Sequence, residues 1–316
     1  MSLRCASFFA GVGGIDLGFH QAGFNTVYAN EFDNYPADTF ELNFDIKVDR
    51  RDIHNVMVDE IPDFDVMLAG FPCQAFSIAG YRQGFDDEKG RGDLFFELVR
   101  IIKSKKPRIA FFENVKNLVS HDNGNTFKII CEQLDLLGYK YISKVMNACE
   151  YGNVPQNRER IYIVAFRDEK DYNNFKMPLP ILLTQSIKDV IDFNVEVDDK
   201  YYYTEKNCSF FEKLKSEMKN SDTIYQWRRV YVRENKSNLV PTLTANMGTG
   251  GHNVPLILTK TNKIRKLTPQ ECFKIQGFPK SFKLPNQSNG RLYKQAGNSV
   301  VVPVINRIAK AINDVI

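Results

Sequence analysis

Metal-ligating and disulfide-forming residues are sparse in this sequence. Its 316 residues include four histidines and six cysteines, and the cysteines, at 5, 73, 131, 149, 208 and 272, form no Cys-x-x-Cys pair. Structural zinc sites and disulfide frameworks both depend on closely spaced cysteines or on a cluster of histidines. The sequence therefore predicts neither a zinc site nor a disulfide framework, and we expect no bound metal.

Long apolar runs and a secretory leader are also lacking. No stretch approaches the roughly 20 residues that cross a bilayer, and Met1-Ser2-Leu3-Arg4 leads directly into a strand-like segment. We therefore expect a soluble, intracellular protein with no membrane partner. The net charge of +4 is compatible with a polyanionic partner but does not require one.

Glycines close the first predicted strand. Residues 3–9 predict a strand, and Gly11, Gly13 and Gly14 follow them before a helical pattern begins at Ile15. A strand, a glycine turn and a helix N-terminus form the usual nucleotide-binding arrangement, because glycine lets the backbone approach the ligand. The spacing is not that of dinucleotide folds and no P-loop lysine follows, so the ligand need not carry phosphate.

Acidic residues follow the next predicted strand and the turn after it. Glu31 and Asp33 come just past a strand at 26–30, and Asp52 lies on a turn after a helix predicted at 34–43. A carboxylate at a strand end suits the two hydroxyls of a ribose. Asp52 suits an exocyclic amine or the capping of its own turn. Together with the glycine turn, these acids predict a nucleoside pocket.

A cysteine follows a short, buried strand. Gly70-Phe71-Pro72 closes the apolar run 65–69 and presents Cys73 on a stiff loop at the C-terminal end of that strand. Open α/β sheets place their chemistry at this end, although a lone cysteine can also be a small buried hydrophobe. The polar segment 74–92 that follows predicts a surface loop, which beside a reactive residue can serve as a lid.

Three further charged residues lie near the ends of later strands. Glu113 follows a buried strand at 108–112 and is either a general acid or a paired surface acid. Arg158 and Arg160 lie at the start of a strand at 160–166. They occupy either a solvent-exposed strand edge or, for one of them, the active centre.

The alternation of strands and helices up to about residue 167 predicts an α/β fold with a doubly wound, mostly parallel sheet. This rhythm breaks from about 168 to 263, where aromatic residues, charges and turns predict a separate, small and irregular module. The apolar stretch 300–316 is expected to pack back on the main sheet. A helix start is predicted at Thr268-Pro269, with an acid in its first turn.

Taken in order, these segments resemble the C5-specific cytosine DNA methyltransferases of restriction-modification systems over nearly the whole chain. The motifs that carry the resemblance are Phe9-Ala10-Gly11-Val12-Gly13-Gly14, Glu31 with Asp33, Asp52-Ile53, Gly70-Phe71-Pro72-Cys73-Gln74, Gly92-Asp93-Leu94, Glu113-Asn114-Val115, Gln156 through Arg160, Arg265-Lys266-Leu267-Thr268-Pro269 with Glu271, and Gly297-Asn298-Ser299-Val300.

The resemblance implies a fold of the S-adenosylmethionine-dependent methyltransferase type and a division of labour along the chain. A cofactor-binding and catalytic domain would comprise 1–183 and 296–316, a target-recognition domain 184–265, and a hinge 266–295. The implied cofactor is S-adenosylmethionine, converted to S-adenosylhomocysteine. Its pocket would involve Phe9, Gly11, Gly14, Glu31, Asp52, Ile53, Pro72, Leu94 and Asn298.

The implied chemistry is methylation of cytosine C5 in DNA after the base has been flipped out of the duplex. Cys73 would attack C6 and Glu113 would hydrogen-bond or protonate N3, with Arg158 and Arg160 completing the catalytic set. A cation is expected near the thiolate, and burial of Glu113 would raise its pKa. Expected contacts to double-stranded DNA are Gln74, Arg82, Arg228, Arg229, Arg233, Thr242 and Thr244.

The resemblance also implies a monomer of the bacterial cytoplasm or nucleoid, whose system includes a cognate restriction endonuclease. Three alternatives stay open. A tRNA cytosine-5 methyltransferase shares the motifs, but the Cys-Phe-Thr signature of that branch is not found. A catalytically silent DNA-binding homologue is disfavoured because Cys73, Glu113, Arg158 and Arg160 are all present. A dinucleotide oxidoreductase shares the fold, but not the glycine spacing.

Overall fold

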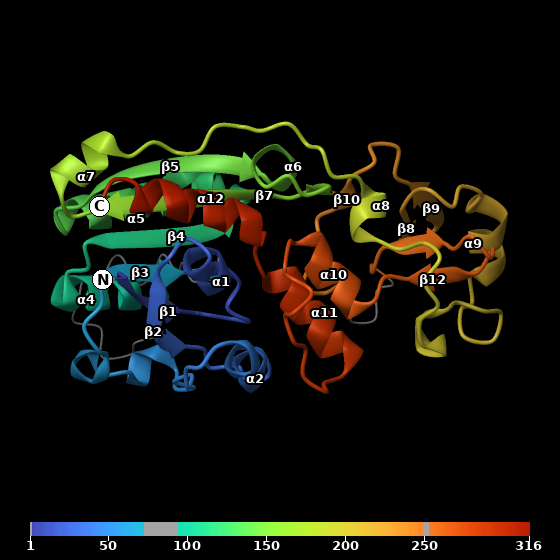
Figure 1. The fold of residues 1–316 in the computed structure, drawn as a ribbon, viewed down its shortest axis with the longest axis horizontal. Coiled ribbons are helices and arrows are strands. Elements are labelled where there is room, and N and C mark those ends of the chain that lie inside the picture. Colours follow the sequence, from blue (N-terminus) through green and yellow to red (C-terminus); the bar gives the residue numbers. More distant parts are fainter. Residues whose placement is uncertain (1, 73–93, 249–252) are drawn as a thin grey trace. The chain divides into compact units, whose positions relative to one another are not determined.

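The computed structural model describes residues 2–72, 94–248 and 253–316 (Figure 1). The chain forms two compact units. Unit 1 contains Met1–Met146, Glu159–Leu179 and Val304–Ile316, and unit 2 contains Asn147–Arg158 and Pro180–Pro303. Across the described ranges, no helix combines the length and apolar character needed to span a membrane.

A six-stranded sheet organises unit 1, with the order β2-β1-β3-β4-β7-β5. The strands are β1 (Arg4–Phe8), β2 (Asn25–Asn30), β3 (Val66–Ala69), β4 (Ile109–Val115), β5 (Lys140–Asn147) and β7 (Glu159–Phe166). β1 pairs in parallel with β2 and β3, and β3 pairs in parallel with β4. β4 and β7 are antiparallel. The predicted α/β fold with a mostly parallel sheet is confirmed.

Helices cover both faces of this sheet. α4 (Leu94–Lys105) and α5 (Asn125–Leu136) share one hydrophobic cluster with alternate strand residues such as Phe112. On the other face, Phe19 of α1 (Gly14–His20) meets Phe111 with ring centroids 5.1 Å apart. α12 (Val302–Asn313) packs beside α1, where Asn306 Nδ2 donates to the Gly18 carbonyl at 3.2 Å. The last apolar stretch thus returns to the main sheet layer, as predicted.

The connections of unit 1 are short helices and turns. They are α2 (Asn34–Asn43), η1 (Ile53–Asn55), η2 (Val58–Glu60), η5 (Lys116–Val119), η6 (His121–Gly124) and α7 (Glu169–Asn174). The predicted helix at 34–43 coincides with α2, whose first turn is capped by the Asp33 side chain accepting from the Tyr35 amide.

Unit 2 contains a small antiparallel sheet with the order β12-β11-β8-β9. Its strands are β8 (Tyr225–Arg228), β9 (Tyr231–Glu234), β11 (Leu256–Leu258) and β12 (Ile264–Lys266), and a separate parallel pair joins β6 (Gln156–Asn157) to β10 (Val240–Pro241). The helices are α6 (Ala148–Tyr151), α8 (Ile187–Val190), η7 (Asp199–Tyr201), α9 (Phe211–Glu217), α10 (Pro269–Ile275) and α11 (Asn289–Asn298). The segment expected to be irregular therefore contains regular strands of three or four residues.

Candidate active site and nucleic-acid interface

Hydrogen bonds hold three segments of unit 1 side by side at the carboxyl ends of β1 and β2: the loop after β1, the loop after β2 and the segment before Asp52. The Ala10 amide donates to the Asn30 carbonyl at 3.0 Å, which joins the glycine turn to the end of β2. The Asn30 side chain donates to the carbonyls of Asp49 and Arg51, both at 2.9 Å. The glycine turn, the acid pair after β2 and the turn at Asp52 therefore share one edge of the sheet, as the sequence predicted.

Backbone amides hold Glu31 in place at this edge. Its Oε2 accepts from the Gly11 amide at 3.0 Å and its Oε1 from the Asp33 amide at 2.9 Å. Gly11 has φ +55°, and a Cβ added there would meet no atom within 4 Å, so the backbone conformation rather than crowding favours glycine. Phe9 has φ 53°, a costly conformation for a side-chain-bearing residue that is typical of functional sites.

Asp52 caps its own turn, which is one of the two readings that the sequence left open. Its carboxylate accepts from the His54 amide at 3.1 Å and contacts the His54 ring. Partial burial opposes the charged form, but these hydrogen bonds outweigh it and lower the pKa of Asp52. The next residue, Ile53, is buried in the core cluster of unit 1.

Phe32 is a candidate site residue that the sequence reasoning missed. Its side chain is 68% exposed between Glu31 and Asp33 in the chain. A large aromatic ring exposed beside a polar pocket is a stacking surface for a planar ligand. The signal was present in the sequence as an aromatic residue between two acids, but its exposure is visible only in the structure.

An ion pair joins β4 and β7 where the expected catalytic residues lie. Arg160 Nε is 3.1 Å from Glu113 Oε1, and both side chains are largely buried. A Cβ placed on Gly70 would lie 3.6 Å from Glu113 Oε2, so the loop after β3 passes directly beside this carboxylate. The Asn114 side chain donates to the Phe71 carbonyl at 2.8 Å and holds that loop.

The structure brings Glu113, Arg160 and the start of the predicted nucleophile loop together. Pro72 is exposed and is the last residue described before the gap. Cys73, Gln74 and Arg82 lie outside the described residues. Of the other predicted cofactor contacts, Gly14 begins α1, Leu94 is half-buried at the start of α4, and Asn298 is exposed at the end of α11 in unit 2.

Arg158 belongs to unit 2 and binds backbone carbonyls there. Its guanidinium donates to Leu243 O at 2.7 Å, to Gly297 O at 3.0 Å and to Ser299 O, and the residue is buried. A Cβ on Gly297 would lie 2.2 Å from the Thr244 carbonyl carbon. Arg158 thus ties together two segments whose backbones approach closely.

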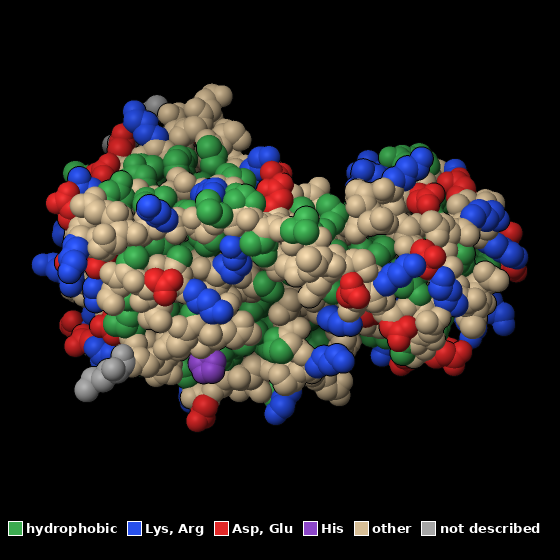
Figure 2. All heavy atoms as spheres, turned by 45° about the horizontal axis from the view of Figure 1, so that its top comes forward, with side chains coloured by type: hydrophobic (Ala, Val, Ile, Leu, Met, Phe, Trp, Pro, Cys, Tyr) green, Lys and Arg blue, Asp and Glu red, His purple; other side chains and the backbone are tan. Residues whose placement is uncertain are grey.

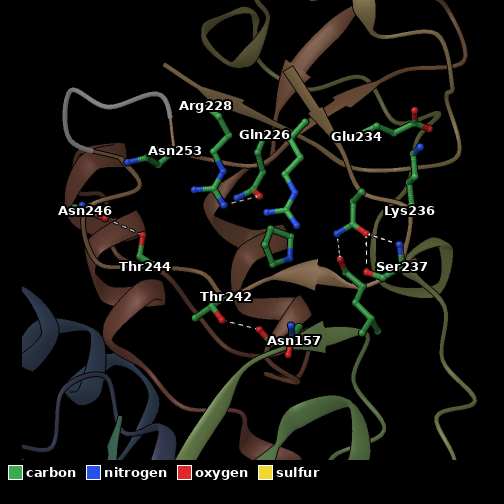
Figure 3. A pocket seen from close by; sticks show the side chains of 14 residues that line it. Asn157, Gln226, Arg228, Glu234, Lys236, Ser237, Thr242, Thr244, Asn246 and Asn253 are labelled. Atoms are coloured by element: carbon green, nitrogen blue, oxygen red, sulfur yellow. Dashed lines mark hydrogen bonds between the residues drawn. The ribbon is translucent and has the colours of Figure 1, made fainter. Parts of the chain in front are cut away.

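Four of the predicted DNA contacts line one polar hollow of about 800 Å³ in unit 2 (Figure 3). They are Arg228, Arg233, Thr242 and Thr244. The Thr242 hydroxyl donates to Asn157 O at 2.6 Å, and the Thr244 hydroxyl donates to Asn246 Oδ1 at 2.8 Å. Arg229 lies instead in the turn of the β8–β9 hairpin with φ 60°, and it is exposed.

Charges of both signs are interspersed on the face drawn in Figure 2. Several lysines of unit 2 form ion pairs with carboxylates: Lys188 and Lys260 share Asp222, and Lys263 contacts Glu196. An interface with nucleic acid must therefore be argued from individual side chains rather than from the net charge.

A doubly wound sheet with a glycine turn and acids at the carboxyl ends of its strands is common to several classes of nucleotide-binding enzyme, so comparison with known proteins decides the class. A family model described as C-5 cytosine-specific DNA methylase matches residues 3–314. The chain belongs to this family, and it is a DNA (cytosine-5) methyltransferase by class.

Curated relatives and solved structures agree with this assignment. The chain is 61% identical to type II methyltransferase M.Bsp6I of Bacillus sp. (strain RFL6), with 98% of each chain covered. It is 39% identical to type II methyltransferase M.HhaI of Haemophilus parahaemolyticus, covering 97% of this chain and 93% of that one. A DNMT2 crystal structure from Spodoptera frugiperda superposes with a TM-score of 0.74 at 22% identity, covering 99% and 100%, which shows the fold alone.

Proposed function

We propose that this protein methylates C5 of one cytosine within a short double-stranded DNA sequence, using S-adenosylmethionine, as the modification half of a restriction-modification system. The observation that carries the proposal is the Glu113–Arg160 ion pair beside the loop that leads into Cys73. An acid and a cation close to a cysteine are the groups that nucleophilic attack on a cytosine ring requires.

The residues at the edge of β1 and β2 fit S-adenosylmethionine. Glu31 is oriented by two backbone amides, and an ionised carboxylate has acceptor sites for the two ribose hydroxyls as well. The exposed ring of Phe32 suits the face of the adenine, and Asp52 its amino group. We assign the remaining contacts to Phe9, Gly11, Gly14, Ile53, Pro72, Leu94 and Asn298. When bound, the cofactor supplies an electrophilic methyl group on a sulfonium centre.

In the proposed reaction the protein first activates the ring. The Cys73 thiolate forms a bond to C6 and pushes an electron pair into the ring, while Glu113 gives N3 a hydrogen bond or a proton. C5 then has the character of an enamine carbon and accepts the methyl group. Loss of the C5 proton and elimination of the Cys73 thiolate restore the double bond and release 5-methylcytosine.

The two arginines have different tasks in this proposal. Arg160 orients the Glu113 carboxylate from 3.1 Å and supplies positive charge near the base. Arg158 acts as a positioning residue, because its guanidinium is engaged by three carbonyl oxygens. Its role is to hold the segments around Leu243 and Gly297 together.

DNA recognition is assigned to the segment 184–265. A stacked cytosine is out of reach of a cysteine side chain, so the base must be flipped out at a cost of a few kcal/mol. Arg228, Arg233, Thr242 and Thr244 around the hollow, with Arg229 at the hairpin turn, are the proposed contacts in this unit. Gln74 and Arg82 are proposed contacts from the segment that follows Cys73.

We further propose that the protein acts as a monomer in the bacterial cytoplasm, where its DNA substrate lies. A cognate endonuclease cleaving the same sequence would be its functional partner without needing to touch it. This proposal is supported by the similarity to proteins that are named type II methyltransferases.

The test is methyl transfer by the purified protein from labelled S-adenosylmethionine to plasmid DNA, to the same DNA made single-stranded, and to tRNA. We expect label in the double-stranded DNA and none with the Cys73→Ser variant. Transfer to tRNA alone would establish the tRNA alternative. Binding of DNA without transfer by folded wild-type protein would establish a catalytically silent homologue.

A further inference from the structure

The β8–β9 hairpin separates an apolar face from a polar one. Strand side chains alternate between faces, so Gln226 and Arg228 share one face of β8 while Tyr225 and Trp227 share the other. Tyr225 and Trp227 pack in the hydrophobic cluster of unit 2. Gln226 pairs across the ladder with Arg233, and all three polar residues line the hollow.

A neutral amide lies between two arginines on that face. Gln226 Oε1 accepts a hydrogen bond from Arg228 Nη2 at 3.1 Å, as Figure 3 shows. An arginine has five N–H donors in a rigid fork, so this contact fixes the plane of the guanidinium while using only one of them. Gln226 thus restricts the orientation of Arg228 without neutralising it.

Positive charge outweighs negative charge around the hollow in the described part of the chain, where Arg228, Arg233 and Lys236 line it with a single acid, Glu234. Neither Arg228 nor Arg233 forms an ion pair there, whereas Lys188, Lys260 and Lys263 of the same unit each meet a carboxylate. Like charges on one face of a strand pair repel each other. A bound polyanion would relieve that repulsion.

We infer that Gln226 is a specificity-determining positioning residue, which holds the Arg228 guanidinium in the orientation that reads a guanine in the DNA site. An arginine presents two parallel N–H donors to O6 and N7 of guanine in the major groove, and this geometry works only if the guanidinium plane is fixed. The inference rests on the proposed function. It adds to that function the base that Arg228 recognises, guanine, and the residue that orients Arg228 for this contact, Gln226.

Two substitutions at Gln226 separate the effect of the hydrogen bond that orients Arg228 from the effect of side-chain size. Gln226→Leu keeps a similar size but removes the acceptor, whereas Gln226→Glu keeps an acceptor for Arg228. Gln21→Leu makes the same chemical change at an exposed glutamine of unit 1 that does not line the hollow, and it is the matched control. All variants are first compared with the wild type by melting temperature.

The readout is kcat/KM for methylation of a set of duplexes in which each base pair around the target cytosine is changed in turn. Gln226→Leu is expected to lower discrimination at one G·C position by about tenfold, with the other positions unchanged. Gln226→Glu should keep the wild-type discrimination but lower kcat/KM on every duplex, because its charge neutralises Arg228 and repels the DNA. Gln21→Leu should change neither quantity. In an Arg228→Leu background, adding Gln226→Leu should cause no further loss, because Gln226 acts through Arg228.

Three outcomes would overturn the inference alone. They are unchanged discrimination in Gln226→Leu, an equal fall of kcat/KM on every duplex in Gln226→Leu, and a full effect of Gln226→Leu in the Arg228→Leu background. In each of them the wild type still methylates one sequence, so the proposed function stands. A folded wild type that methylates none of the duplexes would overturn the proposed function, and this inference with it.

Discussion

Asp16 is a carboxyl group buried inside unit 1, away from the proposed chemistry. It lies on α1 with no exposed surface, and it accepts hydrogen bonds from the hydroxyls of Ser7 and Thr26, both at 2.9 Å. Burial raises the pKa of Asp16 to about 6, and the two hydroxyls offset only part of that rise. The protonation of Asp16 therefore makes the stability of unit 1 depend on pH.

Replacing Asp16 by Asn should change how stability depends on pH. Because the pKa is raised in the folded state, the neutral carboxyl stabilises the fold below its ordinary pKa of 3.8, and this contribution is lost as pH rises through about 6. Relative to Asp16→Asn, the wild-type free energy of unfolding should fall by about 3 kcal/mol between roughly pH 4 and pH 7.5.

Urea unfolding followed by circular dichroism at several pH values measures this difference. Asp63→Asn, at an exposed side chain, is the matched control. Parallel pH profiles for the wild type and Asp16→Asn would show that Asp16 is not the group responsible.

Glu113 is expected to give a hydrogen bond or proton to the base, which an amide can do only in part. Glu113→Gln keeps the size of the side chain but removes the transferable proton and the charge that pairs with Arg160. We expect kcat to fall by about 100-fold or more while the Kd for DNA stays near the wild-type value. Single-turnover kinetics and DNA binding measure the two quantities separately, and a wild-type rate would contradict the assigned role.

At the scale of elements, the start of α10 combines a cap with a buried ion pair. The Thr268 hydroxyl accepts from the Glu271 amide at 3.2 Å, and the Glu271 carboxylate accepts from the Thr268 amide at 2.8 Å. The same carboxylate makes two contacts of 2.8 Å to Arg265, whose side chain has no exposed surface. Glu271 therefore both caps the helix and neutralises Arg265, whereas Thr268 only caps the helix.

Glu271→Ala should destabilise unit 2 much more than Thr268→Ala. Losing the cap costs about 1 kcal/mol, but losing Glu271 also leaves the buried Arg265 without its counter-charge, which costs about 3–5 kcal/mol. Trp227, the only tryptophan, stacks on Phe210 in unit 2 with ring centroids 4.1 Å apart, so its fluorescence reports unfolding of that unit. Equal destabilisation by the two variants would contradict this account of Glu271.

Elements with strong local signals were predictable from the sequence. β3 is an uninterrupted buried run, α2 begins at the predicted residue 34, and α10 begins behind its predicted Thr268-Pro269 start. The four-stranded sheet of unit 2 was not predictable, because strands of three or four residues are too short to show a period. The antiparallel direction of β7 depends on non-local pairing with β4, which periodicity does not encode.

At the scale of the molecule, the two compact units are defined by contacts within the chain, whereas the expected domains were defined by their roles in catalysis and recognition. Residues 147–158 were expected in the catalytic domain and 266–295 as a hinge, and both ranges lie within unit 2. Arg158 gives the physical reason for the first, since its guanidinium binds carbonyls from 243 to 299. Side-chain contacts over such sequence distances are invisible in a linear pattern. The assignment of roles to 184–265 stays a prediction.

Much of the candidate site was predictable because most of its residues follow strand ends in chain order. Glu113 differs from the prediction, because β4 continues to Val115 and Glu113 pairs with Tyr162 inside the strand. The glycine turn, Glu31, Asp52 and Glu113 all lie at one edge of the sheet of unit 1, as topology requires of parallel strands. What the sequence could not show was which residues pair: Arg160 with Glu113, and Arg158 with backbone carbonyls. These pairings depend on side-chain orientation, which is set by packing rather than by spacing.

The most direct test of the central claim is base-resolution sequencing of 5-methylcytosine in plasmid DNA from cells that express this chain, with Cys73→Ser expressed alongside. Our account predicts methylation of one cytosine within a single short sequence in the wild type and none in the variant. Unmodified DNA from well-folded wild-type protein, or the same methylation with Cys73→Ser, would contradict it.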